Sequence, residues 1–387
     1  MISDSPATIF WLALVVVLAP LLARFLRGSR DWSAAGTVAG LIIGSVLGLS
    51  IAGRLDRVRY EQTVLGGMAE RQALESARSE AGAYRAARST LSPSPDADDP
   101  VARAHAQKEE ACLSAWKLAQ QRHQAPARLL LLILTGAMLA CIRSKTTLLP
   151  SPARGAWLHV LIWGALLPAA VVVVLLRLYG TAPHPSLCAA VACSAALLSR
   201  QATTSRGASL AADALLIAGL LASAALLVRI PESGQGAVRA PLAPIITISA
   251  ALMIRPLVSL SRASSSLDRV ARRVILPGVL ALALTHVDVL SDLRLGVLLT
   301  LLIAAGDGRA AGLALGRMVQ FGERWREALG QALASLDAAA VQIAFAALFI
   351  GAGALDRPLV LGVLFAAVLF DWSEGIRAAT ARWCEEK

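Results

Sequence analysis

Long apolar stretches separated by short polar segments make up most of the chain. An apolar stretch of roughly 17 to 25 residues is long enough to cross a bilayer as a helix. The pattern predicts about eleven such spans, at 8–26, 33–53, 127–143, 156–178, 185–200, 207–228, 241–258, 272–288, 293–317, 328–350 and 357–373. We therefore expect an all-α, polytopic transmembrane bundle.

One long polar segment, 54–126, interrupts the series of apolar spans. Its first part, 54–88, is rich in Ala, Glu and Arg, pairs Glu75 with Arg78 by spacing, and predicts a solvated helix. The stretch 89–100, STLSPSPDADDP, has the Pro and Asp residues of a turn, and 101–124 predicts a second helix. We expect an extramembrane helical hairpin, which is either a decorative insertion or an arm for interaction or dimerisation.

These patterns divide the chain into five parts. The first two spans precede the hairpin, the rest of a first repeat follows it, and a second repeat leads to a cytoplasmic tail. In order, the parts are 1–53, 54–126, 127–228, 241–373 and 374–387.

The basic residues lie mainly in alternate loops between the spans. The chain is 56% hydrophobic with a net charge of +11, and because that charge is spread over loops, it indicates topology and not a nucleic-acid partner. The segments expected inside carry Arg24, Arg27, Arg30, Arg143, Lys145, Arg154, Arg200, Arg206, Arg262, Arg269, Arg272, Arg273, Arg317, Arg324, Arg326, Arg377, Arg382 and Lys387. The short outer segments carry only Arg177, Arg229, Arg239, Arg294 and Arg357. We expect a multi-pass protein of the cell inner (plasma) membrane, with the N-terminus outside and the C-terminus cytoplasmic.

Signatures of enzymes and of metal sites are missing from the sequence. The cysteines have no CxxC or Cys/His ligand spacing, and they are Cys112, Cys141, Cys188, Cys193 and Cys384. No Walker loop, nucleophile elbow or zinc signature occurs. We expect no metal, no cofactor and no enzymatic activity.

The charged residues Asp213 and Arg309 both stand inside apolar spans. Asp213 lies in the span 207–228, and Arg309 lies in the span 293–317. A charge in hydrocarbon is costly unless it is paired, protonated or wetted, so an intramembrane Asp is a functional hypothesis. Asp213 is then an ion-binding carboxylate with Arg309 as its counter-charge; the alternative is that Asp213 is solvated near the lipid headgroups.

Three further polar residues are accessory candidates for this ion site. Asp307 precedes Arg309 in the same span, and Asp337 and Gln342 lie in the span 328–350. They offer oxygen atoms, which hard cations prefer as ligands. For Asp337 the alternative is a structural polar pocket or a helix cap.

Several stretches, in this order, resemble the cation/proton antiporter superfamily, the sodium/proton and potassium/proton exchangers. They are FWLALVVVLAPLLARFLRGSRDWSAAGTVAGLIIGSVLG, LLLLILTGAMLACIRSK, LHVLIWGALLPAAVVVVLL, GASLAADALLIAGLL, ILPGVLALALTHVDVLSDL, LLTLLIAAGDGRAAGLALGRM and the WREAL of 325–329. The resemblance implies inverted repeats, a homodimer, and exchange of Na⁺ or K⁺ for protons at a midplane carboxylate. Asp213 falls on the family's ion-binding aspartate, and Gly308 with Arg309 replaces its Gly-Lys motif.

The chain also departs from this family pattern. Ala212 stands where the family has Asn or Asp, the stretch 192–199 lacks the Pro and carboxylate of the family's broken helix, and about two helices are missing. Arginine cannot release its proton at an accessible pH, so Arg309 can act only as a fixed charge. The alternative function is therefore a transport-inactive scaffold or sensor subunit that binds a partner protein through the hairpin 54–126.

The orientation predicts that the turn of the hairpin lies outside the cell. A cysteine introduced as Ser94→Cys should react with a membrane-impermeant thiol reagent in intact cells. Labelling that appears only after permeabilisation would reverse the orientation.

Overall fold

The computed structural model describes most of the chain. The described residues are 6–28, 34–91, 100–142, 156–178, 180, 246, 247, 250, 251, 254, 258, 264–335, 339–351 and 357–385. Among them every regular element is a helix and none is a strand, which confirms the all-α prediction. The spans predicted at 185–200 and 207–228 lie outside the described residues, as does most of 241–258. The span count and the inverted repeats thus stay predictions.

The chain divides into two compact units. The first comprises Met1–Ala13 and Ala52–Arg128, and the second comprises Leu14–Ile51 and Leu129–Lys387. Two helices, α1 (Pro6–Arg27) and α6 (Pro100–Cys141), each contribute residues to both units.

The first unit begins with short helical pieces and not with the single helix predicted over 54–88. Its elements besides α1 and α6 are α3 (Ala52–Leu55), α4 (Arg57–Tyr60), the π-helix η1 (Glu61–Leu65) and α5 (Met68–Leu91). Gly66 and Gly67 separate η1 from α5, with φ of 70° and 75°. That left-handed conformation favours glycine. A Cβ on Gly66 would also lie 2.3 Å from His123 Cγ, so this break requires glycine.

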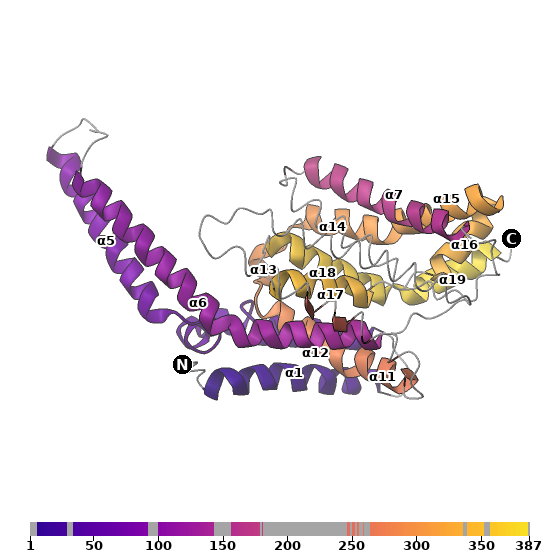
Figure 1. Ribbon diagram of the computed structural model, residues 1–387, viewed down its shortest axis with the longest axis horizontal. Helices are drawn as coiled ribbons and strands as arrows, with labels where there is room; N and C mark the ends of the chain where they lie inside the picture. The colour runs from indigo at the N-terminus through magenta and orange to yellow at the C-terminus, as the bar shows by residue number, and fades with distance from the viewer. Residues whose placement is uncertain are drawn as a thin grey trace. The chain divides into compact units, whose positions relative to one another are not determined.

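The helices α5 and α6 then run side by side in opposite directions (Figure 1). The packed face of α5 has the three- and four-residue spacing of a coiled coil, and its buried members are Leu74, Ala77 and Ala81. Further along, the rings of Tyr84 and His105 lie 5.2 Å apart. Two of the three buried residues are alanines, so the packed face of α5 consists mainly of small side chains. The structure thus contains the predicted pair of helices, whereas most of the turn predicted at 89–100 lies outside the described residues.

Ion pairs flank this packed face on both sides. Arg78 binds Glu109 at 2.8 Å, in place of the Glu75 that the sequence spacing suggested. Lys108 Nζ lies 2.5 Å from Glu80, and this hydrogen bond lowers the pKa of Glu80. The side chains of Lys108 and Glu80 are both exposed, so this ion pair contributes little to the stability of the two helices.

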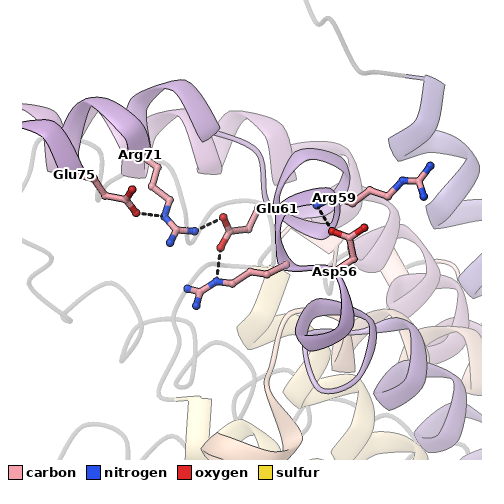
Figure 2. A network of polar contacts seen from close by, with 6 residues as sticks. Asp56, Arg59, Glu61, Arg71 and Glu75 are labelled. Atoms are coloured by element: carbon pink, nitrogen blue, oxygen red, sulfur yellow. Dashed lines mark hydrogen bonds and ion pairs between the residues drawn. The ribbon is translucent and has the colours of Figure 1, made fainter.

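A polar network closes the base of the hairpin. Figure 2 shows Arg71 between Glu61 and Glu75, and Glu61 also binds Arg57. The Glu61 side chain is only 12% exposed. Asp56 caps α4 by accepting a hydrogen bond from the backbone N–H of Arg59. The network holds η1 against the first turns of α5.

The second unit is built around one helix that is buried on every side. All nine residues of α12 (Leu276–Leu284) are buried. Helix α2 (Ala35–Leu47) packs along one side of it, and α17 (Ala339–Gly351) contacts it as well. The other described elements are α7 (Ala156–Leu178), α11 (Ser264–Val270), η2 (Ala271–Ile275), α13 (Val289–Asp292), α14 (Leu295–Ile303), η3 (Ala304–Gly308), α15 (Arg309–Phe321), α16 (Trp325–Ser335), α18 (Arg357–Trp372) and α19 (Glu374–Glu385).

Glycines allow α2 and α12 to approach backbone to backbone. Gly36, Gly40, Gly44 and Gly48 recur every four residues. A Cβ on Gly40 would lie 2.7 Å from the Pro277 carbonyl oxygen, and one on Gly44 would lie 2.7 Å from that of Ala281. Small residues at this spacing are typical of helix pairs in membranes, where close van der Waals packing holds helices together.

Four described helices are long and apolar enough to cross a membrane. They are Ala7–Arg27, Ala35–Leu55, Pro100–Cys141 and the continuous run Leu295–Phe321. A fifth is obtained if α18 and α19, which are bent by 56°, count as one span. The predicted boundary at 126 falls inside α6, because Pro126 removes one hydrogen bond without ending the helix. These helices are compatible with a membrane protein.

The glycine contact predicts a large effect of a single methyl group. Gly44→Ala should separate α2 from α12 and lower the free energy of unfolding by about 1–3 kcal/mol, the usual effect of overpacking. Gly375→Ala is the matched control, because nothing lies within 4 Å of a Cβ there. Thermal unfolding of the purified protein measures both, and equal melting temperatures would refute the contact.

Candidate functional site

The π-helix η3 contacts the helices α7 and α18. Gly308 faces α7, where a Cβ would lie 3.5 Å from Pro168 Cα, and Gly306 faces α18, where a Cβ would lie 3.8 Å from the Phe370 ring. We call this meeting point the η3 crossing and define it by Gly164, Pro168, Gly306, Gly308 and Arg309. It lies within the apolar run Leu295–Phe321.

The two helices in closest contact at the η3 crossing, α7 and η3, both depart from regular α-helical hydrogen bonding. Pro168 lies inside α7 and has no N–H to donate, so the carbonyl of Gly164, four residues earlier, loses its usual helical partner. On the other side, the π-helical turn of η3 replaces regular α-helical hydrogen bonds. Irregular backbone inside apolar helices is typical of sites that bind polar groups.

Glycine brings these two backbones together. A Cβ on Gly312 would lie 2.5 Å from the Trp163 carbonyl oxygen and 3.1 Å from Gly164 Cα. Gly308, Gly312 and Gly316 recur every four residues and all are buried. Gly308 was expected only as part of a family motif, although this spacing is the signal that would have paired α15 with another helix.

Arg309 is the charged group of the η3 crossing. Its side chain is 1% exposed, and it is the largest fully buried side chain among the described residues. A guanidinium has five N–H donors and stays protonated at any accessible pH. The site therefore holds a fixed positive charge, which favours an anionic group or oxygen acceptors beside it.

The other predicted site residues have different fates. Asp307 is exposed, although it precedes the buried Arg309 by only two residues in the sequence. Gln342 is buried on α17, and its Oε1 accepts no hydrogen bond from the described residues. Helix α17 packs on α12 and α18, whereas α15, which begins at Arg309, packs on α7 and α16. Asp213 and Asp337 lie outside the described residues. The pairing of Asp213 with Arg309 is thus untested.

Two polar contacts of the second unit were not predicted from the sequence. Thr37, fully buried on α2, donates a 2.7 Å hydrogen bond to Asp371 at the end of α18. Arg317, also buried, binds Glu323 at 2.8 Å and fixes the turn between α15 and α16. Neither pair has a recognisable spacing in the sequence, because their partners meet only in the fold or across a turn.

Comparisons with known proteins give no relative. No protein-family model matches the chain, and neither a curated protein nor a solved structure matches it. The resemblance to the antiporter superfamily therefore rests on the sequence stretches alone.

The burial of Arg309 predicts a large cost for its removal. Arg309→Gln should strand the groups that compensate its charge and destabilise the protein by about 3–5 kcal/mol. Arg324→Gln removes an equal charge from an exposed site and should change stability by less than about 0.5 kcal/mol. Thermal unfolding in detergent compares the two variants, and equal melting temperatures would contradict the role of Arg309.

Proposed function

We propose that the chain is a secondary transporter of the inner (plasma) membrane that exchanges a monovalent cation, Na⁺ or K⁺, for protons. The observation that supports this proposal is the buried Arg309 at the η3 crossing, where a proline and a π-helical turn interrupt two apolar helices. A buried fixed charge at irregular backbone is a costly arrangement for packing alone. The homodimer and the outside N-terminus belong to the same proposal.

In this mechanism Asp213 is the group that binds the proton and the cation in turn. Its carboxyl binds a proton in one state and a cation in the other, so that loading one displaces the other. The fixed charge of Arg309 is the proposed counter-charge of this carboxyl. Ala212 supplies no ligand oxygen, so water and backbone carbonyls complete the cation shell.

Ion flux tests the proposal directly. Proteoliposomes that contain the purified protein and an internal pH dye should show proton movement when Na⁺ or K⁺ is added, with Li⁺ as a third probe. Asp213→Asn should abolish the signal, whereas Arg324→Gln should retain it. No cation-dependent proton movement from folded protein would refute ion exchange.

A double substitution tests whether Asp213 and Arg309 meet. Each single change, Asp213→Asn or Arg309→Gln, should lower stability by about 3–5 kcal/mol, because it strands the other charge. The double change should recover most of that stability but no transport. Single changes whose destabilisations simply add in the double variant would mean that the two residues do not interact.

The second candidate function is a transport-inactive scaffold or sensor subunit that binds a partner protein through the hairpin. The observation in its favour is that α5 and the first part of α6 belong to a compact unit of their own, fixed by a network at its base. Substituting exposed hairpin residues such as Leu118 should then abolish partner binding and leave ion flux unchanged. Loss of flux in the same variant would favour the transporter.

A further inference from the structure

The last helix, α19, follows α18 without an intervening loop. Only Ser373 separates Trp372, the end of α18, from Glu374, the start of α19, and the two helix axes are bent by 56°. Helix α18 is a buried apolar helix of 16 residues. At about 1.5 Å per residue it is roughly 24 Å long. Since a hydrocarbon core is about 30 Å thick, α19 begins at or near the membrane boundary if α18 spans the bilayer.

The bend is fixed by hydrogen bonds to one carbonyl. The Phe370 carbonyl oxygen accepts from the Ser373 hydroxyl at 2.8 Å and from the Arg377 guanidinium at 2.9 Å. The guanidinium carbon also lies 3.7 Å from the centroid of the Phe370 ring. Backbone carbonyls at a helix end need such partners. The direction of α19 relative to α18 is therefore a built feature.

One side of α19 packs on protein and the other side is apolar and exposed. Ala381 and Cys384 are buried, and α19 packs against α16. Away from these two buried residues, Ile376, Ala379 and Trp383 form an exposed stripe with spacings of three and four, and the exposed Trp372 at the end of α18 precedes it; we call these four residues the α19 apolar face. Its three large side chains are 63%, 73% and 50% exposed for Trp372, Ile376 and Trp383.

We infer that the α19 apolar face lies in the headgroup region of the cytoplasmic leaflet and binds lipid. The sequence analysis assigned Ile376, Ala379 and Trp383 to a cytoplasmic tail. A helix with this pattern is typical of one that lies in the membrane interface, with its apolar face buried about 5–10 Å into the headgroup and acyl boundary. Tryptophan prefers that depth. The inference rests on the membrane embedding in the proposed function and not on ion exchange.

Arginines border the α19 apolar face and fit lipid phosphates. Arg382 is exposed on α19, and the guanidinium of Arg326 on α16 lies 5.5 Å from the centroid of the Trp383 ring. A guanidinium binds phosphate through paired N–H donors. An indole ring beside a guanidinium combines an apolar group with a cation, which suits the boundary between acyl chains and lipid phosphates.

Spin-label accessibility in a bilayer tests the inference. The full chain, with its five cysteines replaced by alanine, carries one nitroxide at Ala379→Cys and is reconstituted in nanodiscs that contain anionic lipid. The water-soluble relaxant should reach this label several-fold less than it reaches a label at the exposed hairpin position Ala73→Cys. Oxygen accessibility should approach that of Val17→Cys, an exposed position of the apolar helix α1.

Each outcome decides for or against lipid binding. Water exposure at Ala379 equal to that at Ala73 would overturn the inference, as would dipolar broadening between copies, which would mean that a second chain covers the face. A water-exposed Val17 would overturn the membrane embedding itself, whereas absent ion flux leaves the lipid contact intact.

A second measurement uses the native cysteines in case the cysteine-free chain fails to fold. Lipids brominated near the glycerol should quench tryptophan fluorescence more in the unsubstituted protein than in Trp383→Phe. Equal quenching in both would show that Trp383 does not contact lipid and would overturn the inference.

Discussion

Close backbone approach at glycines is the constraint on which the second unit depends. A bilayer gives little hydrophobic driving force between helices, so their association relies on van der Waals contact over matched surfaces. Gly40 and Gly44 bring α2 onto α12, and Gly312 brings α15 onto α7 at Trp163. Side chains elsewhere fill the space around these two contacts. The η3 crossing exists because the second contact places Pro168 beside Gly308.

Small buried residues also pack the helical hairpin of the first unit. Its helices α5 and α6 carry many charges, but the pairs Arg78–Glu109 and Lys108–Glu80 are largely exposed and contribute little each. The buried Leu74, Ala77 and Ala81 provide the packing, so the hairpin relies on small residues as the other unit does. Glycine has another role here, since the positive φ of Gly66 and Gly67 ends η1 and starts α5 in a new direction.

Hydrophobic periodicity predicted the long apolar helices among the described residues, but it predicted neither their interruptions nor α19, which was expected to be a tail. The apolar run around Arg309 reads as one helix in the sequence, because a π-helical turn changes hydrogen bonding without changing composition. Pro126 looked like a boundary, although α6 continues through it. Of the site, Arg309 was predictable because a charge in an apolar span is rare. The contact of η3 and α15 with α7 was not predictable, because the sequence does not show which glycine-spaced helices meet in the fold.

Under the proposed ion exchange, the presence of an arginine and not a lysine at position 309 restricts the mechanism. A lysine in this position can lose its proton and contribute to coupling, but Arg309 keeps its charge in every state. If Asp213 is the only group whose occupant changes, a proton on its carboxylate and a bound Na⁺ or K⁺ give the site the same net charge. One cation then replaces one proton, and each cycle moves no net charge across the membrane. Exchange at such a site is driven by the two concentration gradients, whereas a membrane potential contributes nothing to it.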